Sequence, residues 1–554
     1  MRGWVLATAV EPEAWHEKIL SVKANVSAGP SAEMVRLTEF AAWRWAGPQS
    51  AFLRAASPAN IVPLDALEPL SHALYPDTPK PIPIPERESI LIMWPPSEPR
   101  ADLLASLLAS EGSTLLIVPD PNEQDSLAQV FFDLGRNVLV VRSDLPASER
   151  TRIWAEARSG AWVVVGGRSA VFSPVPDLNT VIILDDADEA LAEERAPAWH
   201  ARDLVIERAR RAKAQLVIVS PVPTTEALVA AGPPIDVPVS ISQRGWPNFE
   251  IVDQRQDPPG LGLLALALGP ALHQALSAGQ QALCVLNRKG RARLLACRTC
   301  GELVRCSQCE AVMSEVEDGF LCNQCLAHES HQCRHCGSSK FKAIKPGVTR
   351  VRDALAGLVP HHHVVAIEAG DKTRPKFDVA IGTETILHGF SGTSSPKFDR
   401  PIGLVAFLDF DQELLAPRYR AIEQAAWLLV RAARLVGARS EGGKVLVQTR
   451  IPDHEVLLAA VSGNPQPLLV AERERRQSLG FPPLGGLAAM TGEIEAVDMA
   501  CDSLRDRLEI TGGQGDVLLR APSSTVLCDA LAAVDLGPAR AKGRLRIDVD
   551  PLRV

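Results

Sequence analysis

The chain has 554 residues, of which 46% are hydrophobic and 22% charged, with no strongly biased tract. A single core rarely grows beyond about 250–300 residues, so the length predicts several domains, and the composition excludes wholesale disorder. The formal net charge of −8 gives no support to a nucleic-acid partner, so any DNA contact must come from a local basic surface. Because no membrane span or signal-peptide pattern is found, we expect a cytoplasmic protein with no membrane partner.

The first part of the chain has little regular pattern. An apolar start at residues 3–9 is followed by a helix-like stretch at residues 32–45 and by Pro-containing loops. The segment YPDTPKPIPIP at residues 75–85 predicts an extended linker, because proline fixes φ and lacks the amide donor that helices and sheets need. We place a domain boundary at this segment.

Two α/β units follow the linker. From residue 89 to about residue 229, short apolar runs such as TLLIV and TVIIL alternate with helical patterns, which predicts a parallel sheet covered by helices. A second set of the same kind runs from about residue 264 to residue 449 and encloses a cysteine-rich block. The tail begins with the charged helical segment AERERRQSLGF and ends in the strand-like RLRIDVDP, which predicts a small separate α+β unit.

Eight of the eleven cysteines lie in one short block, with the spacing C-x2-C-x5-C-x2-C-x12-C-x2-C-x7-C-x2-C. Two thiolates separated by two residues can hold one face of a tetrahedral Zn²⁺, and such clustering in a cytosolic chain indicates metal rather than disulfides. Four such pairs predict two metal sites, each with four cysteine ligands. Both are saturated with sulfur, so the metal is expected to be structural.

Two questions about this block stay open from spacing alone. Neighbouring pairs of cysteines can join in sequence, or the outer pairs can close over the inner ones. Four thiolates also suit an iron–sulfur cluster, although ribbon-like pairs favour zinc. His328, His331 and His335 lie among the cysteines and are expected to be surface residues rather than ligands.

Several segments resemble, in the same order, those of the PriA family of primosomal replication-restart proteins (primosomal protein N′). They are LNRKGRARLLACRTCG and CGSSKFKAIKPGVTRVRDAL on either side of the cysteines, VVVGGRSAVFSPVPDLNTVIILDDADEA and APAWHARDLVIERA in the first unit, and FDVAIGTETILHGF and LDFDQELLAPRYRAIEQAAWLLVRAARLVG in the second. The chain is identified as a member of the family, in an actinobacterial-type form with degenerate helicase motifs.

The resemblance implies an α/β fold with two RecA-like helicase lobes of the superfamily 2 type, a double zinc-ribbon insert in lobe 2 and a small α+β C-terminal domain. The implied domains are a truncated N-terminal DNA-binding remnant (1–65), the Pro-rich linker (66–86), lobe 1 (87–235), lobe 2 (236–296 and 337–464), the zinc-binding insert (297–336) and the C-terminal domain (465–554). A winged-helix region is nearly absent, which implies either a true start upstream or an incomplete pocket for the nascent strand.

The resemblance also implies how the cysteines combine. One structural Zn²⁺ would be held by Cys297, Cys300, Cys333 and Cys336, and the other by Cys306, Cys309, Cys322 and Cys325.

The segment that should bind ATP phosphates is altered. A phosphate-binding loop needs glycines, so that amides can approach the phosphates, a lysine, and a Ser or Thr for Mg²⁺. Residues 94–100 instead read WPPSEPR, with three prolines and no glycine or lysine. Proline offers no amide, and Glu98 adds negative charge, whereas Arg100 keeps one positive charge.

Other parts of the family's nucleotide site have changed as well. The acidic box reads Asp-Asp-Ala-Asp from residue 185, Val222 replaces a coupling threonine, and His388 replaces a lysine. The positions retained as degenerate ATP-site residues are Arg100, Asp185, Asp186, Arg431 and Arg434, of which the last two would equally be ordinary helix-surface charges. Phosphoryl transfer needs all its parts in place at once, so we expect no catalytic residues and no measurable ATP hydrolysis. Whether ATP and Mg²⁺ bind without hydrolysis stays open from the sequence.

The resemblance implies a protein that binds abandoned or stalled replication forks, with forked and single-stranded DNA, the replicative helicase and other primosome proteins as partners. Two alternatives remain open: an active ATP-dependent 3′-to-5′ helicase with an atypical nucleotide site, and a zinc-ribbon interaction scaffold with no DNA role. Arg288, Lys289, Arg291 and Arg293 form a basic cluster suited either to phosphate contacts or to a solvated turn. Trp199 lies where the family has its fork-facing loop.

Overall fold

The computed structural model describes residues 4, 27–63, 78–258, 263–286, 295–316, 318–322, 325, 327–343, 348–367, 375–388 and 398–553. Several predictions fall outside these residues. They are most of the apolar start, much of the Pro-rich linker, the basic cluster at residues 288–293, and residues 389–390 at the end of FDVAIGTETILHGF. No described helix is both long enough and apolar enough to cross a bilayer.

Lobe 1 is a six-stranded sheet in the order β1-β8-β5-β2-β4-β3, with every neighbouring pair parallel. Its strands are β1 Ser89–Ile92, β2 Ser113–Ile117, β3 Val138–Val141, β4 Val163–Gly166, β5 Leu178–Leu184 and β8 Gln215–Val219. They are rich in Val, Ile and Leu because helices cover both faces of the sheet. These helices are α3 Ala101–Leu107, α4 Pro121–Asp133, α5 Ala147–Ala157, α6 Ala201–Ala212 and α7 Thr225–Ala231.

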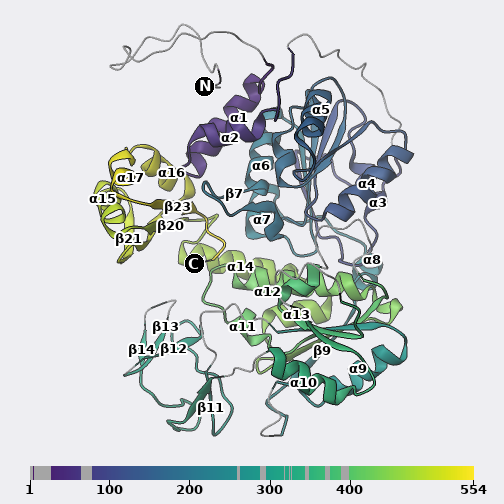
Figure 1. Cartoon of the computed structure of the whole chain (residues 1–554), viewed down its shortest axis with the longest axis vertical. Coiled ribbons are helices and arrows are strands. Elements are labelled where there is room, and N and C mark those ends of the chain that lie inside the picture. Colours follow the sequence, from purple (N-terminus) through teal and green to yellow (C-terminus); the bar gives the residue numbers. More distant parts are fainter. Residues whose placement is uncertain are drawn as a thin grey trace.

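Lobe 2 repeats this construction below lobe 1 in Figure 1, with the order β16-β17-β10-β18-β19-β9 and only parallel pairs. Its strands are β9 Asn248–Asp253, β10 Gln281–Val285, β16 Val364–Ile367, β17 Val379–Gly382, β18 Ile402–Phe407 and β19 Lys444–Thr449. Its helices are α9 Leu268–Ser277, α10 Val348–Leu358, α11 Asp411–Leu414, α12 Ala421–Val436 and α13 Glu455–Ser462, and α8 Val239–Arg244 precedes it. The predicted pair of RecA-like lobes is confirmed.

The cysteine block is inserted between β10 and α10 and forms small antiparallel sheets. Strand β11 Leu295–Cys297 pairs with β15 Phe341–Ala343, while β12 Met313–Val316, β13 Gly319–Cys322 and β14 His328–Glu329 make a three-stranded sheet. The apolar core of this insert is small, centred on Met313 and Phe320 beside two of the cysteines. Such a core is too small to hold a fold by itself, so a further constraint is needed.

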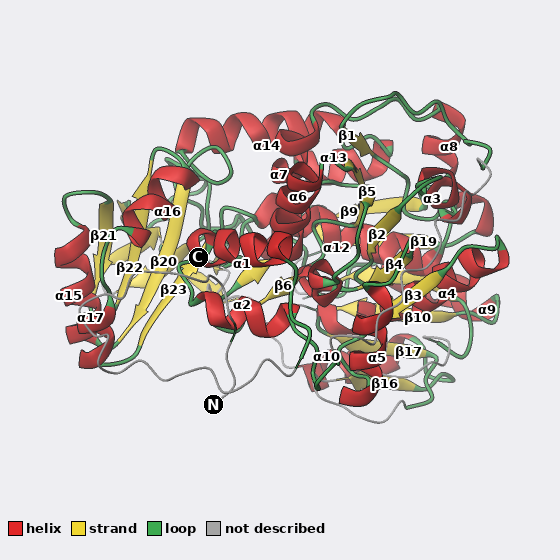
Figure 2. Ribbon diagram, turned by 90° about the horizontal axis from the view of Figure 1, so that it is seen from above, coloured by secondary structure: helices red, strands yellow, loops and turns green. Residues whose placement is uncertain are grey.

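Two flanking units lie on one side of the lobes (Figure 1). At the N-terminal end, α1 Ala32–Arg44 confirms the predicted helix, and α2 Gln49–Ala56 follows it. The C-terminal unit has an antiparallel sheet, β21-β22-β20-β23, built from β20 Gly486–Gly492, β21 Glu509–Gly513, β22 Asp516–Ala521 and β23 Leu545–Val549, with α15 Ile494–Leu504, α16 Ser524–Ala532 and α17 Gly537–Lys542. Helix α14 Gln466–Leu479 runs from this unit towards α7 and α13, which it contacts (Figure 2).

Candidate metal centres and interlobe cleft

The eight clustered cysteines gather into two groups of four. One group is Cys297, Cys300, Cys333 and Cys336, and the other is Cys306, Cys309, Cys322 and Cys325. Within each group all four sulfur atoms lie within 4.8 Å of one another. These are the two sets that the family resemblance implied, with the outer pairs of cysteines closing over the inner ones.

The spacing of the sulfur atoms suits a tetrahedral ion. The Sγ atoms of Cys297 and Cys336 are 3.5 Å apart, and those of Cys309 and Cys322 are 3.4 Å apart. A disulfide would bring them to about 2.0 Å, whereas four sulfurs at about 2.3 Å from one Zn²⁺ would be about 3.8 Å apart. The donor set therefore fits a four-coordinate metal with no open position.

Backbone amides support these thiolates. The amide of Thr299 donates to Cys297 Sγ, and the amide of Gln308 donates to Cys306 Sγ, each over 3.4 Å. The three histidines of the block belong to neither group. His331 instead stacks on Phe320, with ring centroids 4.9 Å apart, and contacts Glu315 over 2.7 Å.

The carboxyl ends of the lobe 1 strands face lobe 2, and this edge is where open α/β sheets bind ligands. Residues 94–100 follow β1 at this edge. Their amides are already used: Trp94 N donates to Ile92 O, Ser97 N to Gly245 O and Glu98 N to Pro95 O. Together with the prolines, this leaves the described loop with few amides for a phosphate.

The carboxylate of Glu98 pairs with Arg244, which ends α8 just before lobe 2. Arg244 donates to both Glu98 carboxylate oxygens, over 2.6 and 2.7 Å. The backbone is packed tightly at this point, since a Cβ added to Gly245 would lie 2.4 Å from Pro95 Cβ.

Three of the five predicted ATP-site positions meet in one ion cluster. Asp185 follows β5 and is 1% exposed. Arg434 on α12 donates to both of its carboxylate oxygens over 2.7 Å each, and Arg100 donates to Oδ2 over 3.0 Å while also pairing with Glu123. Burial alone would raise the pKa of Asp185, but the charges of Arg100 and Arg434 outweigh it and lower the pKa to about 2. The cluster thus joins lobe 1 to lobe 2 through a fully ionised carboxylate.

The other two predicted positions have different partners. Asp186 points to the turn after β8, where Thr224 N donates to its Oδ2 over 3.2 Å, and burial raises its pKa to about 6. Arg431 donates to Asp188 over 3.0 Å and also contacts His388. Both Arg431 and Arg434 lie over the ring of Trp427, with Arg434 partly exposed to solvent.

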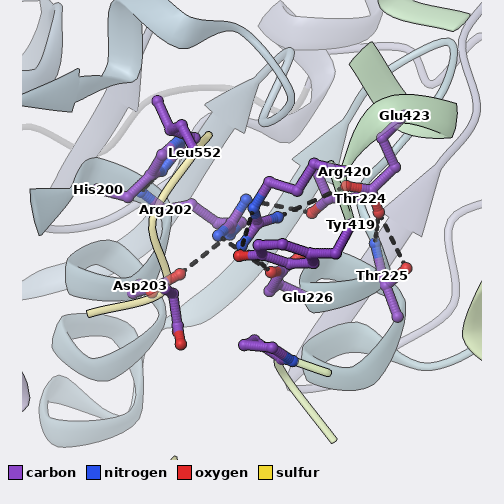
Figure 3. A network of polar contacts seen from close by, with 12 residues as sticks. His200, Arg202, Asp203, Thr224, Thr225, Glu226, Tyr419, Arg420, Glu423 and Leu552 are labelled. Carbon is purple, nitrogen blue, oxygen red and sulfur yellow. Dashed lines mark hydrogen bonds and ion pairs between the residues drawn. The ribbon is translucent and has the colours of Figure 1, made fainter. Parts of the chain in front are cut away.

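A second cluster of buried charges lies deeper between the lobes and had not been anticipated from the sequence. Arg420 pairs with Glu226 over 2.5 Å, and Arg202 approaches the same carboxylate over 3.7 Å (Figure 3). Glu423 accepts from both the amide and the hydroxyl of Thr225, over 2.7 and 2.9 Å (Figure 3). The cluster therefore connects α6 and α7 of lobe 1 with the start of α12 in lobe 2.

Arg476 of α14 completes this buried cluster and is 1% exposed. It pairs with Glu423 over 2.6 Å, with Glu226 over 3.5 Å and with Glu472 over 2.8 Å. Three arginines thus face three glutamates, because Arg202 and Arg420 are the other two cations. At the edge of the cluster, Arg44 of α1 pairs with Asp550 after β23. All parts of the fold except the cysteine insert contribute to this junction.

His200 at the margin of the cluster predicts a pH dependence of stability. It caps α6, since its Nδ1 accepts from the amide of Arg202 over 3.1 Å, and burial, aided by the charge of Arg202, lowers its pKa to about 3. Below pH 6.5 the unfolded chain binds a proton that the folded chain excludes, so this contribution is lost as the pH falls from about 6.5 towards 3. Going from pH 7 to pH 5 should lower the free energy of unfolding by about 1–2 kcal/mol more in the native chain than in His200→Asn.

Urea unfolding of both proteins at the two pH values measures this difference. Asparagine keeps the helix cap, and all other titrating groups are shared. An equal loss of stability in both proteins would show that His200 is not held neutral.

No protein-family model matches the chain. Among curated proteins, the probable replication restart protein PriA of Mycobacterium leprae (strain TN) is 31% identical over 434 residues, which are 74% of this chain and 65% of the relative. The replication restart protein PriA of Bacillus subtilis (strain 168) is 25% identical over 423 residues, which are 72% of this chain and 52% of the relative. The chain thus spans about half to two thirds of the length of these relatives.

Solved structures give a distant likeness. Saccharomyces cerevisiae Dbp5 bound to RNA and ADP BeF3 is 10% identical, with a TM-score of 0.35, over 70% of this chain and 90% of that chain. The assignment of two RecA-like lobes therefore depends on the strand order and the parallel pairing described above.

Proposed function

Because the chain belongs to the PriA family of replication restart proteins, we propose that it is a fork-binding adaptor that does not hydrolyse ATP. It recognises abandoned or stalled forks through forked and single-stranded DNA. It then promotes primosome assembly and loading of the replicative helicase, and works in the cytoplasm. The two lobes act as a scaffold rather than as a motor.

The observation that carries the loss of ATP chemistry is the ion cluster at Asp185. An ATP site needs a free carboxylate for Mg²⁺, and arginines free to reach the transferring phosphate. Here Asp185 is bound by Arg434 and Arg100, while Arg431 is bound to Asp188. A nucleotide would have to displace these ion pairs. Its phosphates would then lie beside a loop that has three prolines, few free amides and the negative charge of Glu98. These contacts support a scaffold over the alternative of an active 3′-to-5′ helicase.

We propose zinc as the metal of the two four-cysteine groups. Cys297, Cys300, Cys333 and Cys336 would hold one ion, and Cys306, Cys309, Cys322 and Cys325 the other. Four thiolates in a closed tetrahedron suit a structural Zn²⁺, which would supply folding energy to a module whose own core is small. The insert then serves to engage partner proteins and DNA strands.

One experiment tests the proposal on the zinc-loaded protein with a model replication fork. We expect fork binding that weakens steeply as salt rises, because phosphate contacts release counterions. Binding should be equal with and without Mg-ATP, and phosphate release should stay at the level of a protein-free control. Fork titration by fluorescence anisotropy and a coupled phosphate assay measure the two quantities.

Each alternative has its own signature in this experiment. DNA-stimulated ATP turnover that is abolished in Asp185→Ala would establish an active helicase. Absence of fork binding at ~50 mM salt, where nonspecific phosphate contacts are strong, would favour a zinc-ribbon interaction scaffold without a DNA role.

A further inference from the structure

Several contacts across the interface between the lobes join the segments that follow lobe 1 strands to helix α12. Arg434 binds Asp185, Arg431 binds Asp188, and Ser97 Oγ donates to the carbonyl of Ala433 over 3.3 Å. Farther along the helix, Gln424 donates to Glu189 over 3.1 Å. Helix α12 lies at the junction of the two lobes in Figure 1, so these contacts follow its length.

We propose that these contacts form an internal lock that keeps the two lobes closed without nucleotide. In a two-state protein, a ligand closes the lobes by binding the closed state more tightly than the open one. In this chain the contacts that would close the lobes are made by its own side chains. The inference rests on the proposed loss of ATP chemistry and extends it, because it states which conformation the protein holds in place of a nucleotide cycle.

The geometry of the lock favours the closed state strongly. Asp185 is almost fully buried, so separating the lobes would remove two charge-assisted hydrogen bonds from one carboxylate. Arg434 is also held in place, since its guanidinium carbon lies 5.3 Å from the ring of Trp427. Both partners are therefore preorganised, and closure costs little side-chain entropy.

The deeper charge cluster also favours the closed arrangement of the lobes. Glu423 of α12 binds Thr225 of lobe 1, and Arg420 binds Glu226. Separation of the lobes would break the bonds from Glu423 to Thr225 and from Arg420 to Glu226, and the loss of a partner within a buried charge cluster is costly. In the segment that connects the lobes, the backbone of Gly245 packs against Pro95 so closely that no side chain would fit. This close packing also opposes a change in the relative position of the lobes.

The distance between the lobes tests the lock directly. Dyes attached to unnatural amino acids at Asp133 on α4 and Gln274 on α9, both exposed, report the separation by single-molecule energy transfer. We expect the full-length, zinc-loaded protein to show one narrow, short distance that Mg-ATP or a nonhydrolysable analogue leaves unchanged. In Asp185→Asn and in Arg434→Gln the distribution should extend to longer distances, and amide exchange in α12 should be roughly tenfold faster.

Asp125→Asn is the matched control, because Asp125 pairs with Arg142 on the lobe 1 surface and does not reach lobe 2. It should behave as the native chain does. Arg434→Gln changes a partly exposed side chain and keeps the test usable if Asp185→Asn fails to fold. A broad distribution in the native protein, a shortening with nucleotide, or lock variants that match the native chain would each overturn the proposal. ATP hydrolysis is measured separately, so an active motor would be recognised independently of the lobe distance.

Discussion

Removal of the metal is expected to unfold the cysteine insert while both parallel sheets stay folded. Structural Zn²⁺ in small modules contributes about 10–16 kcal/mol of apparent binding free energy, far more than the few buried apolar side chains of this insert can supply. Treatment with a chelator should release two zinc ions per chain. Amides of β12, β13 and β14 should then exchange near the rate of an unfolded chain, whereas those of β5 and β18 stay protected, as measured by hydrogen–deuterium exchange and elemental analysis.

Single cysteine variants separate the two sites. Cys309→Ser should lose one zinc and keep the ion of the other group, because each group has its own four sulfurs. Cys501 lies on α15, outside both groups, so Cys501→Ser is the matched control and should keep both ions. Two zinc ions retained in Cys309→Ser, iron in place of zinc, or full protection of the insert after chelation would contradict the assignment.

The metal centres and the lobes were open to prediction from the sequence because their signals are local. Four pairs of cysteines at fixed spacing predict two sulfur sites, and short apolar runs between helices predict parallel sheets. The combination of the pairs was not fixed by spacing, because both arrangements satisfy a tetrahedron. Antiparallel pairing of β11 with β15 resolves this, since it brings Cys297 and Cys336 close together.

The buried charge cluster could not be predicted in the same way. Arg476 lies in AERERRQSLGF, which reads as a solvated helix, and four of its neighbours are also charged. Only the packing of α14 against α7 and α13 shows that Arg476 and Glu472 face inwards. Likewise, Arg434 read equally well as a surface charge, and its role follows from the position of α12 opposite Asp185. Charge partners far apart in sequence leave no periodic signal.

The altered nucleotide motifs are easier to understand once these partners are known. Asp185 is buried, where a carboxylate without a counter-ion is strongly unfavourable, and Arg434 supplies one counter-ion from lobe 2. Arg100 stands at the end of the altered loop and supplies a charge to Asp185 from within lobe 1. The altered motifs therefore coincide with a charge arrangement in which Asp185 has counter-ions without a triphosphate.

The largest effect of a single side chain is expected at Glu226. In Glu226→Gln the three buried cations Arg202, Arg420 and Arg476 keep their charge but lose one of their three counter-ions, and removing one partner from a buried ion cluster costs about 3–5 kcal/mol. The first unfolding transition in urea should move to markedly lower concentration, with faster exchange in α7, the start of α12 and α14. Glu474→Gln, on the exposed side of α14, should change stability by less than about 0.5 kcal/mol. If the two variants unfold alike, the cluster does not hold the lobes and the C-terminal unit together.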